Sequence, residues 1–364
     1  MILNEILSTL ALTRLRGLSA AAATAAIRYY GSAAAVWADG GSQSERLARL
    51  IDNAAARREA FDRAQQEADY CQEHGVRILT LTDADYPQLL ADCGDAPPQL
   101  FMQGHVPCNA RHSISVVGTR RITDYGRAMV AQLLQRLAEQ MEGVLVVSGL
   151  AYGVDICAHR AALQHHLPTA AVLAHGLDRL YPAAHRDDAQ RMCAEGGLLT
   201  EYFTHTVPDK GNFVSRNRIV AGMTRATLVV ESADHGGALI TARLAAGYQR
   251  EVLAVPGRVT DPFSAGCNQL ITQGDAMLVT CADDIMRLLG WEPTRATAEA
   301  PALLTAYTAE QERVLSCLNL VDAVTFDQLV ARSGVPGPRL RVLLFELQAV
   351  QAIRVQAGSH YLLA

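Results

Sequence analysis

The sequence predicts an α/β fold built on a doubly wound, mostly parallel sheet, with a helical N-terminal domain and a winged-helix-like C-terminal domain. Between about residues 111 and 291, short apolar runs typical of buried strands alternate with helix-like stretches. Such alternation favours a parallel sheet with right-handed crossovers, whose ligands bind beyond the carboxyl ends of the strands. The predicted strands span residues 114–117, 144–148, 169–173, 198–201, 227–231 and 252–255.

The chain divides into four predicted segments. Residues 1–65 are alanine-rich with leucine and isoleucine at helical spacing, so they predict a small helical domain, either a docking bundle or a helix-hairpin-helix that contacts a DNA backbone. Residues 66–291 form the extended core, which begins with an edge strand at 77–81. Residues 292–304 lack periodicity and predict a linker. Residues 305–364 show three helical patterns and a terminal hairpin, the order of a winged helix.

The composition is that of a folded protein, because half of the 364 residues are hydrophobic and 19% are charged. The formal net charge of −5 provides no global attraction for nucleic acid, so any polyanion site must be a local cluster of cations. The eight cysteines lack zinc-ligand spacing and are expected to be reduced. Since no basic leader or bilayer-length apolar stretch is evident, we expect a cytoplasmic protein without membrane contact.

The turn Gly118-Thr119-Arg120-Arg121 follows the first buried strand directly. A glycine-opened turn between a strand and a helix is expected to present backbone N–H groups and the positive end of the helix dipole to an anion. The two arginines make phosphate the favoured anion. Three more glycine-rich turns follow later strands, at residues 148–155, 175–178 and 231–237. Neither the dinucleotide spacing G-x-G-x-x-G nor a Walker motif is present, so the pattern supports no bound NAD and no Walker-type ATPase.

The segment 210–225 carries four cations and no acidic residue, namely Lys210, Arg216, Arg218 and Arg225. In an acidic chain this favours an anionic partner. If the segment is helical, Arg216 and Arg218 point apart, so that one faces the ligand and the other the sheet. Phe213 is placed to stack on a base, as aromatic residues do in single-strand binders. The alternative is that Phe213 is a hydrophobic anchor and Arg218 a buried structural arginine.

Two further features invite a catalytic or binding interpretation. Asp155 and His159 lie four residues apart on a predicted helix, but no serine or cysteine nucleophile stands beside them, so a structural role is favoured. Tyr181-Pro182 shapes a loop wall, or Tyr181 stacks on a ligand.

Taken together, these segments resemble the DNA-processing protein A (DprA, also called Smf) family of bacteria. The resemblance covers residues 76–290 and rests on an ordered series of motifs. These are Tyr86-Pro87 with Pro97-Pro98, Val117-Gly118-Thr119-Arg120, Ser148-Gly149-Leu150-Ala151-Tyr152-Gly153-Val154-Asp155 with Ala158-His159, Tyr181-Pro182, Ser215-Arg216-Asn217-Arg218-Ile219-Val220-Ala221-Gly222, Glu231 with Thr241-Ala242, Ala254-Val255-Pro256-Gly257, and Gly266-Cys267-Asn268-Gln269-Leu270-Ile271.

The resemblance implies a Rossmann-like core that binds single-stranded DNA and helps to load the recombinase RecA during natural transformation. It implies a DNA-binding mediator rather than an enzyme, without a cofactor or metal, and a homodimer, with which the apolar stretch 270–279 is consistent. The predicted DNA-binding residues are Gly118, Thr119, Arg120 and Arg121 in the first turn, and Lys210, Phe213, Arg216, Asn217 and Arg218 in the basic segment.

The chain departs from the family pattern at two positions. Val214 follows Phe213 where many members have proline, and Gly236-Gly237 stands where Ser-Gly is usual. The first change alters the rigidity of the basic loop, because valine does not fix φ as proline does.

Two other functions are alternatives. A phosphoribohydrolase of the lysine-decarboxylase-like type would use an acid such as Glu231 and would release the base from AMP, although the glycine-glycine and glutamate motif of that family is missing. A winged-helix regulator with a ligand-sensing core would bind duplex DNA sequence-specifically. The predicted recognition helix carries only Arg339 and Arg341, opposed by Glu346, which favours protein contact or modest DNA contact.

Overall fold

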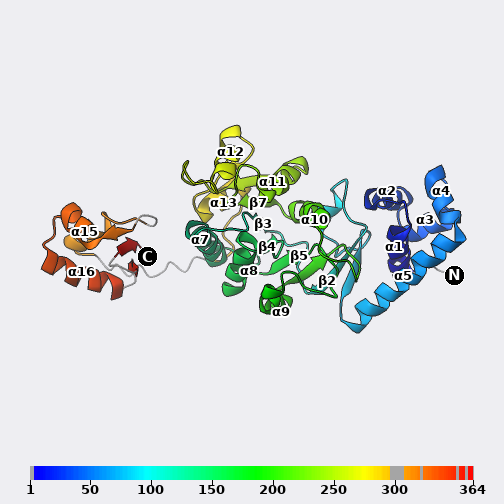
Figure 1. Cartoon of the computed structure of the whole chain (residues 1–364), viewed down its shortest axis with the longest axis horizontal. Coiled ribbons are helices and arrows are strands. Elements are labelled where there is room, and N and C mark those ends of the chain that lie inside the picture. Colours follow the sequence, from blue (N-terminus) through cyan, green and yellow to red (C-terminus); the bar gives the residue numbers. More distant parts are fainter. Residues whose placement is uncertain (1–3, 296–306, 320–322, 350–351, 357–359, 364) are drawn as a thin grey trace. The chain divides into compact units, whose positions relative to one another are not determined.

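The computed structural model describes residues 4–295, 307–319, 323–349, 352–356 and 360–363. The chain forms two compact units, residues 1–295 and 296–364. The first contains a helical part and the sheet core, and the second is a small winged unit (Figure 1). Of the predicted linker 292–304, residues 296–304 lie outside the described residues. The preceding residues remain attached to the core, since the N–H groups of Thr294 and Arg295 both donate to the Gln140 carbonyl oxygen.

The core is a nine-stranded sheet in the order β1-β2-β6-β5-β4-β3-β7-β8-β9. The strands from β6 to β9 in this order are parallel, whereas β2 is antiparallel to β6 and β1 is antiparallel to β2. The strands are β1 (Arg77–Thr80), β2 (Gln99–Gly104), β3 (Ser113–Val117), β4 (Leu145–Ser148), β5 (Thr169–Val172), β6 (Gly197–Thr200), β7 (Ala226–Val229), β8 (Glu251–Ala254) and β9 (Met277–Leu278). The predicted doubly wound sheet is therefore confirmed.

The direction of winding reverses beside β3. From β3 the chain proceeds outward through β4, β5 and β6, and it then returns through α10 (Lys210–Gly222) to β7 on the other side of β3. A pocket is expected where the winding reverses, because the loops after neighbouring strands there turn in opposite directions. Every residue of β3 is buried, as is usual for a parallel strand covered on both faces.

Helices cover both faces of the sheet (Figure 1). Each layer buries its apolar side chains against alternating residues of the same strands. One face is packed by α7 (Asp124–Gln140), α8 (Val154–Gln164) and α13 (Ala282–Leu289), with α9 (Arg186–Glu195) beside α8 over β5 and β6. The other face is packed by α6 (Gln88–Ala91), α10, α11 (Gly237–Gly247) and α12 (Ala265–Gln273).

The N-terminal helical part contains α1 (Glu5–Arg14), α2 (Ala20–Tyr30), α3 (Ala33–Asp39), α4 (Glu45–Asp52) and α5 (Ala54–Glu73). The last helix runs to Glu73 rather than ending near residue 65, so the helical part is longer than the sequence suggested. It packs on the sheet core through Phe101 and Phe203, whose rings make an edge contact at 5.3 Å.

The winged unit consists of α14 (Ala309–Leu315), β10 (Val324–Thr325), α15 (Phe326–Ser333), α16 (Gly337–Ala349), β11 (Ile353–Gln356) and β12 (His360–Leu363). Its strands form one sheet in the order β10-β12-β11. On α16 the Arg339 guanidinium pairs with Glu310 at 2.8 Å, and Arg341 lies over the Phe326 ring. The predicted recognition helix instead exposes the apolar side chains of Val342 and Phe345.

No helix among the described residues has both the length and the apolar character that a membrane crossing demands. All eight cysteines are free thiols, and Cys281 is the one that is exposed.

A buried carboxylate joins the helical part to the core. Glu67 of α5 is 2% exposed and accepts hydrogen bonds from the Thr204 backbone N–H at 2.8 Å and from its hydroxyl at 2.6 Å. The Arg63 guanidinium donates to the same carboxylate and to the Thr204 carbonyl oxygen. This network connects α5 to the loop that follows β6.

We predict that Glu67→Ala lowers the free energy of unfolding by about 3 kcal/mol, because it leaves the buried Thr204 N–H without an acceptor and the Arg63 guanidinium without its carboxylate. Urea denaturation of the full chain, followed by circular dichroism, measures the change. Glu45→Ala is the matched control, since Glu45 is exposed and pairs only with exposed Arg49. Equal small losses in both variants would contradict the assignment.

Candidate nucleic-acid interface

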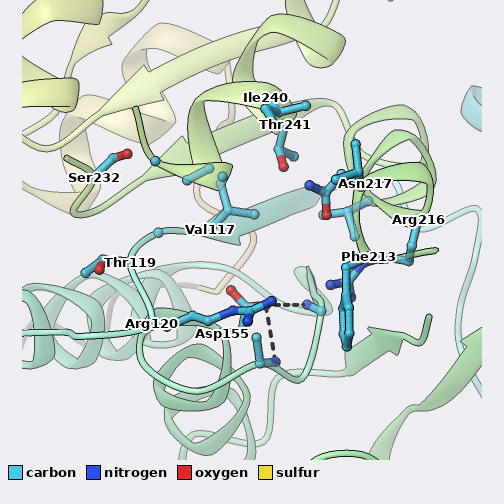
Figure 2. A pocket seen from close by; sticks show the side chains of 18 of the residues that line it. Val117, Thr119, Arg120, Asp155, Phe213, Arg216, Asn217, Ser232, Ile240 and Thr241 are labelled. Atoms are coloured by element: carbon cyan, nitrogen blue, oxygen red, sulfur yellow. Dashed lines mark hydrogen bonds between the residues drawn. The ribbon is translucent and has the colours of Figure 1, made fainter. Parts of the chain in front are cut away.

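A pocket of about 930 Å³ opens at the carboxyl ends of β3, β4 and β7, where the winding of the sheet reverses. Its walls come from the Gly118 turn, the turn at Gly149–Ala151, the first half of α10, and the loop and helix from Ser232 to Thr241. Figure 2 shows side chains of these segments converging from opposite sides. A cavity therefore lies where the fold predicts that a ligand binds.

The Gly118 turn does not have the form that the sequence suggested. Its Thr119 N–H donates to the Glu231 carbonyl oxygen at 2.6 Å. At the start of α7, the Glu231 carboxylate accepts from the Thr123 N–H at 2.9 Å and from the Thr123 hydroxyl at 2.5 Å. Glu231 is 1% exposed, so a buried carboxylate already neutralises the positive end of α7. The helix end at which the sequence predicted an anion cradle is therefore occupied by Glu231, and the side chains of this turn are what it offers to an anion.

Arg120 and two aromatic rings form one wall of the pocket. The Arg120 guanidinium lies 5.3 Å from the centre of the Phe213 ring, and that ring lies 5.8 Å from the ring of Tyr181 (Figure 2 labels the first two). Arg120 is exposed, and no carboxylate among the described residues pairs with it. Tyr181 is 46% exposed, which leaves part of its ring open to a ligand.

The position of Tyr181 is set by a buried histidine that the sequence did not single out. Nδ1 of His175 donates to the Gly176 carbonyl oxygen at 2.9 Å, and Nε2 accepts from the Tyr181 N–H at 3.2 Å. These bonds assign the neutral tautomer with the proton on Nδ1. Burial lowers the pKa of His175, which favours the same neutral form.

The first half of α10 contributes polar side chains to the pocket. Lys210 is exposed at the helix start, and Asn217 follows Phe213 by four residues, so that both face the pocket (Figure 2). Thr119 lies on the opposite side. The helix α11 begins at the pocket with Gly236 as its N-cap, and no side chain caps its N–H groups. The uncapped helix end therefore belongs to α11 rather than α7.

Arg216 forms the floor of the pocket and is only 4% exposed. Its Nη1 donates to the Val172 carbonyl oxygen, and the guanidinium lies against Gly149, where a Cβ would collide with it. Burial lowers the pKa of Arg216, and the Arg120 cation acts in the same direction. The Asp155 carboxylate attracts Arg216 and accepts from the N–H groups of Gly149 and Ala151 at 3.1 and 3.3 Å. The result is a guanidinium held in place beneath the pocket and partly neutralised by a buried carboxylate.

Two of the predicted DNA-binding arginines do not line the pocket. Arg218 points away from it, as the helical spacing required, and pairs with Glu201 at 2.5 Å, with 12% and 11% of the two side chains exposed. Arg121 turns outward and lies 5.6 Å from the centre of the Phe263 ring. The structure thus brings together Gly118, Thr119, Arg120, Lys210, Phe213, Arg216 and Asn217, and it separates Arg121 and Arg218 from them.

Asp155 and His159 have separate structural roles. Asp155 holds the turn after β4, whereas Nδ1 of His159 lies 2.8 Å from the Thr169 hydroxyl in the interior. Burial lowers the pKa of His159 to about 3, so the ring is neutral near pH 7. The structural role that the sequence favoured for both residues agrees with these contacts. In the described part of the chain, no group of His, Cys, Asp and Glu side chains is arranged to hold a metal ion.

The comparisons with known proteins agree with this architecture. A family model described as DNA recombination-mediator protein A matches residues 77–290, and one described as the DprA winged helix domain matches residues 293–358. The chain belongs to this family. It is 38% identical over 301 residues to a putative DNA processing protein DprA of Mycobacterium tuberculosis, a match that covers 79% of this chain and 76% of the relative. It is 35% identical over 315 residues to protein Smf of Escherichia coli, covering 83% and 82%.

Solved structures of the family share the fold. DNA processing protein A from Streptococcus pneumoniae matches with a TM-score of 0.66 and 30% identity, over 79% of this chain and 98% of that chain. A structure of DNA processing protein A from Helicobacter pylori, described for its single-stranded DNA binding mode, matches with a TM-score of 0.53 and 28% identity, over 59% and 95%. Membership places this chain among the DNA-processing recombination mediators and confirms the Rossmann-like core with a winged-helix unit.

Proposed function

We propose that this protein binds single-stranded DNA in the pocket beside β3. The observation that carries the proposal is the exposed Arg120 guanidinium, which has no carboxylate partner in the described residues and lies over Phe213 next to Tyr181. A cation beside aromatic rings suits a nucleotide, since phosphate and base lie a few ångströms apart on one strand. The Helicobacter pylori relative is described as a protein that binds single-stranded DNA, which supports the same class of ligand for this chain.

Binding of this kind is largely independent of base sequence. Lys210 and Arg120 offer point charges for phosphates, and stacking on Phe213 and Tyr181 accepts any base. Duplex DNA hides its base faces, so the rings favour the single strand. The buried Arg216 adds a positive potential to the pocket floor that Asp155 offsets only in part.

The two alternatives gain less support from the structure. The acid required by the phosphoribohydrolase, Glu231, is buried against Thr123 at the start of α7 and does not line the pocket. Sequence-specific duplex binding by the winged unit would need free cations on α16, but Arg339 pairs with Glu310 and Arg341 packs on Phe326. We therefore propose a binding protein rather than an enzyme.

We predict that Arg120→Ala weakens binding of fluorescent oligo-dT and reduces the slope of log affinity against log salt by about 0.7 for each phosphate that the arginine neutralises. The matched control is Arg121→Ala, because Arg121 also lies over a phenylalanine but outside the pocket. Fluorescence anisotropy across a salt series measures both, with the matched duplex as a second ligand. Unchanged affinity and slope for Arg120→Ala would remove this residue from the site.

We predict that Phe213→Leu lowers the affinity for oligo-dT by about 1–3 kcal/mol while leaving the salt slope unchanged, because it removes stacking but no charge. Phe263→Leu is the corresponding control, since both rings are half-buried and both carry an arginine. The same anisotropy titration measures the change. Equal losses in the two variants would mean that Phe213 acts through the fold and not through a base.

The finer part of the proposal concerns partners. Family membership suggests that a homodimer delivers the strand to RecA during natural transformation, and the edge strand β9 with its exposed Leu278 is available for a partner. We predict that light scattering gives the protein the mass of a dimer. We also predict that it shortens the lag of RecA-dependent ATP hydrolysis on single-stranded DNA coated with a single-strand-binding protein, and that the Arg120→Ala variant does not. A lag unaffected by the unmodified protein would exclude delivery to RecA.

A further inference from the structure

A second pocket, of about 720 Å³, lies in the helical part between the end of α1 and the beginning of α5. Figure 1 shows these two helices side by side. Four arginines and two carboxylates line this pocket, so its lining has a net positive charge although the whole chain has a net charge of −5. The lining cations are Arg14, Arg16, Arg58 and Arg63, and the carboxylates are those of Glu59 and Asp62.

The four arginines of this pocket differ in whether they form an ion pair. Arg63 is held by buried Glu67, and Arg16 pairs with Glu59 in an ion pair that is 82% and 61% exposed. An exposed pair of this kind is weak and exchanges readily for another anion. Within the described residues, neither Arg14 nor Arg58 forms an ion pair or a hydrogen bond through its side chain. Arg14 lies over the Phe203 ring and is attracted by Glu67 and Glu59 only at longer range, so neither guanidinium is held by an anion in direct contact.

The first turn of α5 increases the positive potential at the same place. This helix of 20 residues has no acidic residue in its first turn, where Asp and Glu are usually found, and begins instead with three alanines followed by Arg57 and Arg58. Asn53 caps only the N–H of Ala56, at 3.1 Å, and the preceding Ala54 and Ala55 line the pocket. Cations beside the positive end of a helix repel it unless an anion lies between them.

The pocket borders the loop that leads to the DNA site. Arg14 and Arg63 each lie 5.1 Å from the centre of the Phe203 ring, and this residue follows β6. Five residues later the same loop reaches Pro208, which lines the first pocket beside Lys210. Those five residues span at most about 17 Å, a distance that a few nucleotides of a single strand can cover.

We propose that Arg14 and Arg58, with the beginning of α5, form a second anion site that binds a backbone phosphate of the same DNA strand. The inference rests on the proposed function of the first pocket and extends it, because it assigns the helical part a share in DNA binding. The first pocket provides stacking and the second provides charge alone, since no aromatic residue lines it. The strand would run from Lys210 along the loop to the end of α1.

The test compares two lengths of oligo-dT, about three and about thirty nucleotides, because a strand that just fills the first pocket is too short to reach the second, whereas the long strand reaches both. The variant is the double substitution Arg14→Ala with Arg58→Ala in the full chain. The control is Arg49→Ala with Arg191→Ala, which removes the same charge from exposed positions outside both pockets. Removing Arg58 relieves repulsion at the helix end, whereas removing Arg14 loses its contact with the Phe203 ring, so thermal unfolding of both double variants is measured beside binding.

We expect the double variant to bind the long strand roughly tenfold more weakly at low salt, with a salt slope smaller by about 0.7 for the one phosphate lost, and to bind the short strand as the unmodified protein does. Unchanged binding of the long strand would overturn the second site and leave the first intact. An equal loss on both lengths would also overturn it, since the arginines would then act on the first pocket. If the unmodified protein bound neither strand, the proposed function and this inference would fail together.

Discussion

The buried carboxylate of Glu231 determines what this sheet can bind. In a doubly wound fold, the helix after the first central strand offers its positive end to a ligand phosphate. Here that end is filled from within, because Glu231 accepts both hydrogen bonds of Thr123 and lies against Gly126, where any Cβ would collide with it. The N-terminal end of α7, where a nucleotide phosphate would bind in such a fold, is occupied by the carboxylate of the protein itself. In the proposed binding mode, contact with the ligand falls to the side chains around it, and Arg120 is the exposed cation of the turn that lines the pocket.

The helix α10 shows how one segment serves both stability and binding. It crosses from one half of the sheet to the other, with its first half partly exposed at the pocket and residues 219–222 buried in the core. Arg216 points to the pocket floor and is neutralised in part by Asp155. Arg218 points to Glu201, and this ion pair neutralises its charge. Cations buried in this way need a partner or a hydrogen bond, and the structure provides one for each. The exposed charges at the helix start are then the ones left for a ligand.

The sequence predicted those parts of the structure that local pattern controls. The strands at 114–117 and 144–148 were found within a residue because continuous apolar runs between turns are a local signal. The opposite directions of Arg216 and Arg218 followed from helix geometry alone. Which of two adjacent residues in a turn points inward is not a local property: Arg120 reaches Phe213, 93 positions away, whereas Arg121 meets Phe263. The role of His175 likewise depends on a loop that folds back on it.

The extent of the helical part was missed for a related reason. Helix α5 continues past residue 65 because no glycine or proline interrupts it before Gly75, and its inner face is committed to the core through Glu67. That commitment has a functional consequence. A helical part held to the loop after β6 by a buried carboxylate keeps its arginines at a constant place beside the proposed DNA site, which a flexibly tethered domain could not do. In an acidic chain, where long-range attraction of DNA is weak, such a fixed arrangement of a few exposed cations is the physical means by which a strand can be held.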